Sequence, residues 1–388
     1  MNYLVNNARL VLTDRVVEHA SLLIEDGLIA SIDPIDPTRA QSAHVIDLDN
    51  RYLLPGLIDL HADALEKDIE PRPNVHFPLA YAIAQADKRN AAAGITTVFH
   101  SLSFANAELG LRNNGIAAEI VRAIHAFNGK GLVDNRAHTR YEITDPTALP
   151  VLLELLDEDC VHLLSIMDHT PGQGQFKDMR AYQEYLQKSY QTTEAETQAL
   201  IDDKLAQAEG AQIRVKQLIE YAHRKSVRVA SHDDDCRDKI TELKELNIHI
   251  SEFPTNLETA RYAIEQGMTT IMGAPNIVRG KSQSGSMKAQ DAIEHGVASC
   301  LCSDYAPASL LTAVFMLAQR EVQSLPNAVR LVSVNPAAAL GMIDRGEIAV
   351  GKRADLVCVE FLNDYPQVWQ CWVKGRRVYQ AGFGGAAI

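Results

Sequence analysis

The sequence predicts an α/β protein: a (β/α)8 barrel of the TIM type, with a small β-sandwich built from both chain ends. From about residue 53 to residue 345, apolar strand-like runs alternate with helical stretches, and repeated β-then-α units imply a parallel sheet. About eight such units fit this length, as in a (β/α)8 barrel. The two ends are rich in strands, and each is too short to form a core alone, so we expect them to pair.

Short apolar or alternating runs, separated by turn signals such as Asp26-Gly27, make up both chain ends. The expected strands are residues 3–5, 9–12, 20–24 and 28–32 at the start, and residues 355–359 and 367–373 at the end. We therefore predict a composite β-sandwich of residues 1–53 and 346–388, and a barrel of residues 54–345. A doubly wound open sheet is the competing architecture, but the sequence has no Gly-rich dinucleotide loop.

The middle segment supplies the barrel elements. The expected strands are residues 53–58, 95–100, 137–143, 161–167, 227–230, 248–250, 269–272 and 298–302. The expected helices include residues 117–127, one long stretch over 192–226, and residues 239–246 and 258–265. Residues 170–210 form a longer segment than a barrel loop requires, which predicts a lid over a substrate.

The composition argues against several classes of protein. The formal net charge of -13 disfavours binding of nucleic acid or an anionic membrane by the whole surface, although a local basic pocket stays open. The six scattered cysteines have no zinc-knuckle spacing, and a disulfide framework is not expected. No apolar run has transmembrane length and no signal-peptide pattern is present, so a soluble cytoplasmic protein is the expectation.

Two potential metal ligands follow the first barrel strand. His61 and Asp63 are two residues apart, and in an extended strand such residues point the same way. Imidazole nitrogen and carboxylate oxygen are ligands that zinc takes in proteins. For this stretch alone, a core histidine beside an ordinary strand-end carboxylate is an equally good explanation.

Imidazoles and carboxylates also follow the other predicted strands. In a (β/α)8 barrel these positions meet at the carboxyl ends of the strands, where the chemistry takes place. At least five strands deliver such a residue, and a metal ion would remove the cost of gathering these charges. The imidazoles and carboxylates are His138, Glu142, Asp168, His169, His232, Asp233, Asp234, Asp235, Glu252 and Asp304. Arg140 lies on the same face of its strand as Glu142.

This series resembles the pattern of the amidohydrolase superfamily. That pattern has a His-x-His or His-x-Asp pair after the first strand, a bridging residue on the fourth, histidines on the fifth and sixth, and an aspartate on the eighth. Longer blocks resemble one of its families, PhnM, the α-D-ribose 1-methylphosphonate 5-triphosphate diphosphatases. The blocks run in order along most of the chain and include residues 54–58, 71–73, 167–173, 230–234, 252–255, 272–280, 284–285 and 303–305.

Two features depart from the wider superfamily. Asp63 stands where a second histidine is usual, and no lysine is present at the position that often carries a carboxylated, bridging lysine. The resemblance implies that Glu142 supplies this bridge as a carboxylate. It leaves open whether one or two metal ions bind.

The resemblance also implies the ligands of each ion. A first ion would be held by His61, Asp63, Asp304 and one oxygen of Glu142. A second would be held by His169, His232 and the other oxygen of Glu142. Zinc is the expected divalent metal, and manganese and iron are alternatives that imidazole and carboxylate also suit.

One neighbouring side chain has a predicted catalytic role, and three others each have two possible roles. Asp304 is the candidate general base for the attacking water, because a carboxylate that touches the water can accept its proton. Asp168 and Asp233 either orient the ligands or are simply solvated. His138 either faces the pocket or caps a strand.

A triphosphate substrate requires positive charge around it. A guanidinium binds phosphate oxygens bidentately, and a lysine acts as a point charge. Arg279 is preferred because it lies in a Gly- and Ser-rich segment, residues 274–285, whose backbone N–H groups also suit phosphate. The candidate phosphate-binding residues are Arg72, Arg140, Arg279 and Lys281, with Lys177 as a weaker one.

The resemblance implies hydrolysis of α-D-ribose 1-methylphosphonate 5-triphosphate to the 5-phosphate and pyrophosphate, in phosphonate catabolism by the C–P lyase pathway. The alternative is cleavage of a C–N bond in a small cyclic or N-acyl substrate, with the same metal site polarising a carbonyl or imine. A non-enzymatic scaffold ranks last, because none of the ligands is missing. The expected partner is a small phosphorylated sugar phosphonate, with neither nucleic acid nor membrane, and homo-oligomerisation stays open.

Overall fold

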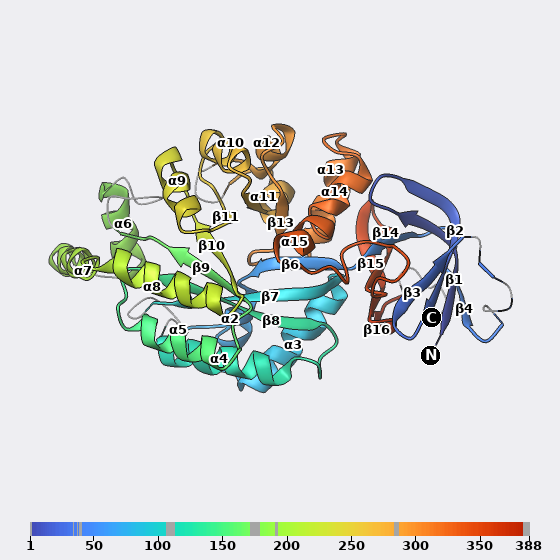
Figure 1. The fold of residues 1–388 in the computed structure, drawn as a ribbon, viewed down its shortest axis with the longest axis horizontal. Helices are drawn as coiled ribbons and strands as arrows, with labels where there is room; N and C mark the ends of the chain where they lie inside the picture. Colours follow the sequence, from blue (N-terminus) through green and yellow to red (C-terminus); the bar gives the residue numbers. More distant parts are fainter. Residues whose placement is uncertain are drawn as a thin grey trace.

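Two sheets organise the protein. The computed structural model describes residues 2–33, 35–36, 38, 41–105, 113–170, 179–190, 193–282 and 287–382. Within these ranges one eight-stranded sheet forms a parallel barrel flanked by helices, and a second eight-stranded sheet gathers strands from both chain ends beside it (Figure 1). This architecture confirms the predicted fold class.

The barrel strands pair in chain order, and each is parallel to the next. They are β6 (Leu57–Ala62), β7 (Ile95–Phe104), β8 (Asp134–Glu142), β9 (Leu163–Met167), β10 (Arg228–His232), β11 (Ile250–Glu252), β12 (Thr269–Gly273) and β13 (Cys300–Cys302). Every residue of β6, β7, β9, β11 and β13 is buried, as expected for strands that are covered on both faces.

The barrel closes where β6 and β13 meet near their carboxyl ends. Ala62 and Asp304 form a parallel bridge between the two strand ends. The amide of Asp63 donates to the carbonyl of Asp304 at 2.8 Å, and the amide of Asp304 donates to the carbonyl of His61 at 2.9 Å. The backbone hydrogen bonds of this closure therefore involve three of the predicted metal ligands.

Farther down the same seam, another part of the chain lies between the two strands. The carbonyl of Leu331 accepts from the amide of Leu301, and the carbonyl of Val332 accepts from the amide of Ile58, each at 2.8 Å. This insertion satisfies backbone groups that would otherwise be buried without partners.

The helices cover the outside of the barrel with apolar faces. In α4, the buried Ala117, Ile120, Val121 and Ile124 recur at the spacing of one helix face. Among the described residues, no helix is both long and apolar enough to cross a membrane. The helices are α2 (Ala64–Ile69), α3 (Leu79–Ala92), α4 (Asn114–Phe127), α5 (Ala148–Asp157), α6 (Met179–Tyr190), α7 (Glu194–Gln207), α8 (Ala211–Arg224), α9 (Arg237–Glu245), α10 (Leu257–Glu265), α11 (Ala274–Arg279), α12 (Ala289–Glu294), α13 (Ser309–Gln319), α14 (Leu325–Arg330) and α15 (Val334–Ala339).

The stretch over residues 192–226, predicted to be largely helical, forms two helices. Helix α7 ends at Gln207 and α8 begins at Ala211. Between them Gly210 has a φ of 75°, a left-handed conformation that glycine adopts readily. In the predicted lid segment, residues 171–178, including Lys177, and residues 191–192 lie outside the described residues.

The second sheet joins the two ends of the chain. Its order is β16-β15-β14-β5-β1-β2-β3, with β4 also paired to β1. The antiparallel pairing of β5 with β14 links the N-terminal strands to the C-terminal ones. The strands are β1 (Tyr3–Val11), β2 (Val16–Glu25), β3 (Leu28–Ile32), β4 (His44–Asp47), β5 (Tyr52–Pro55), β14 (Leu356–Leu362), β15 (Tyr365–Val373) and β16 (Arg376–Gln380).

This sheet curls over a core of its own. The rings of Tyr3 on β1 and Trp372 on β15 are 4.8 Å apart, although β14 and β5 lie between their strands in the sheet. Buried residues of both chain ends, such as Leu22 and Leu356, belong to the same apolar cluster. The pairing of the two strand-rich ends follows the sequence-based expectation.

The apolar run at residues 53–58, predicted as one strand, is divided between the two sheets. Strand β5 ends at Pro55 and β6 begins at Leu57. Between them the amide of Gly56 donates to the carbonyl of Asp355 at 2.7 Å. A Cβ at Gly56 would lie 2.2 Å from Oγ1 of Thr96, so the chain needs glycine at this crossing.

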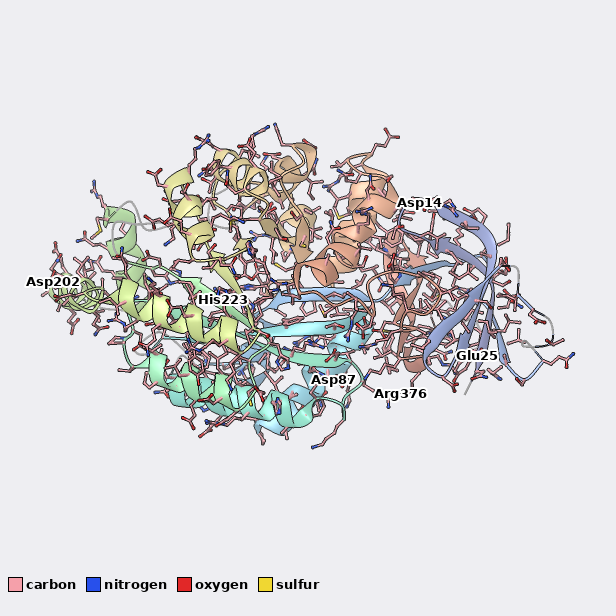
Figure 2. All side chains as sticks on the ribbon, viewed as in Figure 1. Asp14, Glu25, Asp87, Asp202, His223 and Arg376 are labelled. Carbon is pink, nitrogen blue, oxygen red and sulfur yellow. The ribbon has the colours of Figure 1, made fainter. Side chains whose placement is uncertain are left out.

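A loop of the barrel is held between a barrel helix and the curled sheet. Asp87 of α3 accepts from the backbone amides of Leu132 at 2.7 Å and Val133 at 3.1 Å. From the other side, Arg376 of β16 donates to the carbonyl of Gly131 at 3.1 Å (Figure 2). These contacts connect the two sheets through residues 131–133.

Replacing Gly56 with alanine should destabilise the fold, because the added methyl group would collide with the buried Thr96 side chain. We expect a loss of about 1–3 kcal/mol in the free energy of unfolding, measured by urea denaturation. Gly115→Ala in α4, where the nearest side-chain atom lies 3.1 Å from the new Cβ, is the control and should change stability by less than about 1 kcal/mol. Equal stability of G56A and the parent protein would contradict the proposed crowding.

Candidate metal centre and active site

Three of the predicted ligands lie together at the closure of the barrel. His61, Asp63 and Asp304 each offer one ligand atom, and these atoms lie within 4.8 Å of one another. Nε2 of His61 is 3.2 Å from Oδ1 of Asp63. The bridge between β6 and β13 accounts for this approach, because it aligns the two strand ends that carry these side chains.

His232, at the end of β10, joins this group through Arg140. Nη1 of Arg140 is 3.3 Å from Oδ1 of Asp63, and Nη2 is 3.2 Å from Nε2 of His232. A guanidinium can only donate, so Nε2 of His232 accepts this hydrogen bond. The other ring nitrogen, Nδ1, is 3.0 Å from Oδ2 of Asp233.

Glu142 and His169 form a second pair at the same end of the barrel. Nδ1 of His169 is 2.8 Å from Oε2 of Glu142, while Oε1 accepts from the hydroxyl of Thr144 at 2.9 Å. Burial raises the pKa of Asp233, but the charges of His232 and His169 outweigh it and hold that pKa below its usual value. Asp233 thus interacts with a histidine of each group.

Glu252, at the end of β11, lies behind His61. Its Oε1 is 3.1 Å from Nδ1 of His61, and its Oε2 accepts from the hydroxyl of Ser165. Ser165 also contacts Nε2 of His138. All four side chains are almost fully buried.

His138 faces the barrel interior rather than an open pocket. Burial lowers the pKa of His138 to about 3, so the ring is neutral, and its Nδ1 accepts from the hydroxyl of Ser101 at 3.1 Å. With His61 and Glu252 it forms another group of ligand atoms that lie within 4.8 Å of one another. The sequence analysis identified His138 and Glu252 as polar strand-end residues but missed the hydrogen bonds that link them through Ser165. A polar serine within a buried strand was the feature that could have indicated this link.

Three residues within two positions of the carboxyl ends of barrel strands have left-handed backbones. The φ angles are 57° for Asp233, 53° for Phe253 and 54° for Asp304. This conformation is costly for a large side chain such as Phe253 and is found where the surrounding structure imposes it. The Phe253 ring packs 5.0 Å from the ring of His61 and 5.1 Å from that of His232, so it fixes the spacing between them.

Asp59 ties the two closing strands together beneath this group. Its Oδ1 accepts from the amide of Ser303 at 3.0 Å and from the amide of His61 at 3.3 Å. Complete burial raises the pKa of Asp59 to about 6. One carboxylate therefore holds the backbone next to Asp304 and the backbone of His61.

The charges of the group shift the proton affinities of its members. Burial lowers the pKa of His61, but Asp63 and Glu252 outweigh this effect and raise it to about 10. Asp63 is held below its usual pKa despite its burial, mainly by Arg140 and His61. Burial and the neighbouring Asp63 raise the pKa of Asp304, which increases its capacity to accept a proton.

The four predicted phosphate-binding residues occupy different places. Arg140 is buried within the ligand group. Arg279 is exposed at the end of α11, and its Nη1 is 3.2 Å from the hydroxyl of Tyr305, the residue after Asp304. Arg72 and Lys281 are exposed on loops. Residues 284–285 of the Gly- and Ser-rich segment lie outside the described residues.

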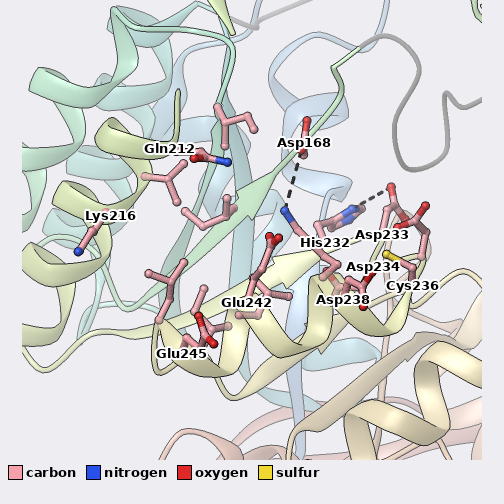
Figure 3. A pocket seen from close by; sticks show the side chains of 18 residues that line it. Asp168, Gln212, Lys216, His232, Asp233, Asp234, Cys236, Asp238, Glu242 and Glu245 are labelled. Carbon is pink, nitrogen blue, oxygen red and sulfur yellow. Dashed lines mark ion pairs between the residues drawn. The ribbon is translucent and has the colours of Figure 1, made fainter. Parts of the chain in front are cut away.

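A cavity of about 740 Å³ opens beside β10, with His232 and Asp233 in its wall (Figure 3). Asp168 also lines it and lies 3.9 Å from Nζ of Lys239. Acidic residues outnumber lysines in the lining of the cavity, so the cavity suits cations better than phosphate. The acidic residues are Asp168, Asp233, Asp234, Asp235, Asp238, Glu242 and Glu245, and the lysines are Lys216 and Lys239.

Comparison with known proteins identifies the family. A model of the amidohydrolase family matches residues 52–378. The chain belongs to the amidohydrolase family. A relative from Escherichia coli (strain K12), named alpha-D-ribose 1-methylphosphonate 5-triphosphate diphosphatase, is 36% identical over 381 residues, which cover 97% of this chain and 100% of that protein. This relative confirms the family resemblance predicted from the sequence.

Solved structures of other amidohydrolases share the fold. An N-acetylglucosamine-6-phosphate deacetylase from Pasteurella multocida has a TM-score of 0.64 at 13% identity, covering 97% of this chain and 99% of that one. A dihydropyrimidinase from Brevibacillus agri NCHU1002 has a TM-score of 0.59 at 16% identity, covering 98% of this chain and 95% of that one. At such identities the similarity speaks for the fold alone.

In this amidohydrolase the predicted ligands lie on other strands than the superfamily pattern suggested. Glu142 ends β8, the third barrel strand, whereas the bridging residue was expected on the fourth. His169 follows the fourth strand and His232 ends the fifth, so the expected fifth and sixth positions are wrong. The sixth strand instead ends in Glu252. The sequence analysis matched these residues to the superfamily pattern by their order in the chain, and this order is the same whether or not each residue is shifted by one strand.

The donors of this amidohydrolase fit a divalent metal. Imidazole nitrogens and carboxylate oxygens converge from both sides of the barrel closure. Oε2 of Glu142 is a buried polar atom without a hydrogen-bond partner among the described residues, although Nδ1 of His169 lies 2.8 Å from it. Binding to a cation would satisfy such an atom.

Metal binding by this amidohydrolase should release a proton from His61. Without metal its pKa of about 10 keeps the ring protonated at neutral pH, and a metal ion can bind only the deprotonated nitrogen. Zinc affinity should therefore rise with pH, by about tenfold per pH unit, until the pH approaches this pKa. Proton release can be followed with an indicator dye in weak buffer. A His61→Asn variant should release fewer protons, whereas an affinity that is constant from acid to alkaline pH would contradict the assignment.

Proposed function

We propose that this protein hydrolyses alpha-D-ribose 1-methylphosphonate 5-triphosphate to the 5-phosphate and pyrophosphate. The observation that carries the proposal is the 36% identity, over 97% of the chain, to a protein named for this reaction. A cluster of imidazoles and carboxylates at the active end of a (β/α)8 barrel supports it chemically.

The metal ligands belong to the same proposal. His61, Asp63 and Asp304 would hold one divalent ion together with Glu142, and His169 and His232 would hold a second with the same carboxylate. Zinc is the preferred metal, and manganese or iron also suits these donors. Bound divalent ions supply Lewis-acid catalysis, which neutralises charge on the phosphoryl oxygens and makes water more acidic.

The protein's own residues then handle the water and the substrate. The reaction breaks the bridge between the first and second phosphorus atoms: water adds its oxygen to one of them, and the other departs with the bridging oxygen. Asp304 accepts the proton of the attacking water, and its raised pKa favours this role near neutral pH. Arg279, whose guanidinium lies beside the hydroxyl of Tyr305, neutralises the outer phosphates of the substrate.

The protein is proposed to act in the cytoplasm, within phosphonate catabolism. All six cysteines are free, which agrees with a reducing compartment. Cleavage of C–N bonds stays the alternative function, but the dihydropyrimidinase, at 16% identity, shares only the fold with this chain and does not support that reaction.

The proposed reaction can be tested with the purified, metal-loaded protein and the ribose triphosphate. Phosphorus NMR should detect pyrophosphate, and ¹⁸O-labelled water should mark the phosphorus that is attacked. Asp304→Asn should lower turnover by about 100-fold or more, and metal content should be measured alongside. Asp14→Asn, which changes an exposed aspartate paired with Arg15 in the terminal sheet, is the control. Turnover of a dihydropyrimidine, without release of pyrophosphate from the triphosphate, would favour the C–N alternative.

The role of Arg279 predicts a change in substrate binding. Arg279→Ala should raise KM for the triphosphate by about tenfold or more, because a hydrogen bond between charged groups is lost. Arg224→Ala is the matched control, since Arg224 ends α8 where the chain enters β10, at the opposite end of the barrel. Steady-state kinetics with both variants checks the prediction, and an unchanged KM for R279A would remove Arg279 from the phosphate site.

A further inference from the structure

We propose that Glu252 is a positioning residue that fixes the ring of His61 for metal binding. The inference rests on the metal site of the proposed function, but it concerns how tightly the metal is held rather than which substrate is cleaved. Glu252 ends the sixth barrel strand, where the superfamily pattern led us to expect a metal-binding histidine. The chain thus has a carboxylate in place of an imidazole.

The contact between Glu252 and His61 determines which ring nitrogen faces the other ligands. Oε1 of Glu252 is 3.1 Å from Nδ1 of His61, and an ionised carboxylate can only accept a hydrogen bond. Nδ1 therefore carries a proton. Nε2 is the nitrogen that faces Asp63, at 3.2 Å from Oδ1, and it is the one available to a metal. A carboxylate behind a metal-binding histidine fixes the tautomer and raises the basicity of the ring.

Glu252 is itself held in place through its second oxygen. Oε2 accepts from the hydroxyl of Ser165, which also contacts Nε2 of His138. Because that hydroxyl donates to Glu252, it accepts from Nε2 of His138, and Nδ1 of the neutral ring accepts from the hydroxyl of Ser101 on β7, at 3.1 Å. This chain of hydrogen bonds runs from His61 through Glu252, Ser165 and His138 to a neighbouring barrel strand, so Glu252 is held firmly behind the ring of His61.

The same contacts argue that Glu252 is not a ligand. Both of its oxygens already have hydrogen-bond partners, and His138, the other member of its group, is bonded through both ring nitrogens, to Ser165 and to Ser101. Glu252 and His138 have no exposed surface, in contrast to Asp63 and Asp304, which are partly exposed. A metal at this deeper position would have to break a network that is already satisfied.

The decisive measurement is metal binding by variants of Glu252. Glu252→Gln keeps an oxygen that can accept from His61, so zinc affinity should fall by about tenfold, whereas Glu252→Ala should lower it by about 100-fold. The number of ions bound at saturation should stay as in the parent protein. The absorption spectrum of the cobalt-loaded protein should change in both variants, because the ring of His61 is no longer fixed.

Glu360→Gln provides the matched control. Glu360 is a partly buried carboxylate of β14 that pairs with Arg51 at 3.1 Å in the terminal sheet, away from the barrel ligands. Its replacement should leave zinc affinity and the cobalt spectrum unchanged. If E252A does not fold, Ser165→Ala removes the support of Oε2 and should weaken zinc binding by less than E252Q does.

Two outcomes would overturn the proposal. If zinc affinity is unchanged in E252Q and also in E252A (or in S165A, if E252A does not fold), then the contact between Glu252 and His61 does not position the ring. Loss of one bound ion in folded E252Q would make Glu252 a ligand. A parent protein that binds zinc but releases no pyrophosphate would defeat the proposed function and leave these metal measurements interpretable, so the two failures can be told apart.

Discussion

The closure of the barrel between β6 and β13 is the interaction on which the active end depends. Two backbone hydrogen bonds, between Asp63 and Asp304 and between Asp304 and His61, align strand ends that are far apart in the chain. Asp59 strengthens this seam by accepting from the amides of both strands. Because the three side chains predicted to bind metal belong to the residues that form the seam, closing the barrel also brings these side chains together.

Burying so many charged groups together requires that each has a counterpart. Asp63 is balanced by Arg140, Glu142 by His169, and Glu252 by His61. Such pairs are sensitive to the loss of a single member, because the remaining charge would be left without compensation in a poorly solvated site. The active end is therefore built from mutually dependent pairs.

Much of the fold could be predicted from the sequence, because period-two and apolar patterns report directly on buried strands. The same patterns failed at Gly56, where the apolar run continues across a change of sheet. They predicted the helical stretch over residues 192–226 but did not locate its break at Gly210, because helix-favouring residues continue on both sides. In both cases the tertiary contacts or the backbone conformation at one glycine decided the structure, and local propensities do not report them.

For the site, the types of residue that gather at the strand ends were more predictable than the contacts between their side chains. Convergence of His61, Asp63 and Asp304 follows from strand ends meeting in a barrel. The guanidinium of Arg140 between Asp63 and His232, and the Phe253 ring between two histidines, depend on side-chain directions across several strands. A single sequence does not encode those directions in any local pattern.

The pairing of β5 with β14 has a consequence for synthesis of the chain. Arg51 and Glu360, which form an ion pair across this junction, are 309 positions apart. During translation β5 emerges long before its partner, so the N-terminal strands expose an open edge while the barrel is made. Until β14 is made, this edge is open to pairing with other strands, so the terminal sheet is complete only when the whole barrel has been synthesised.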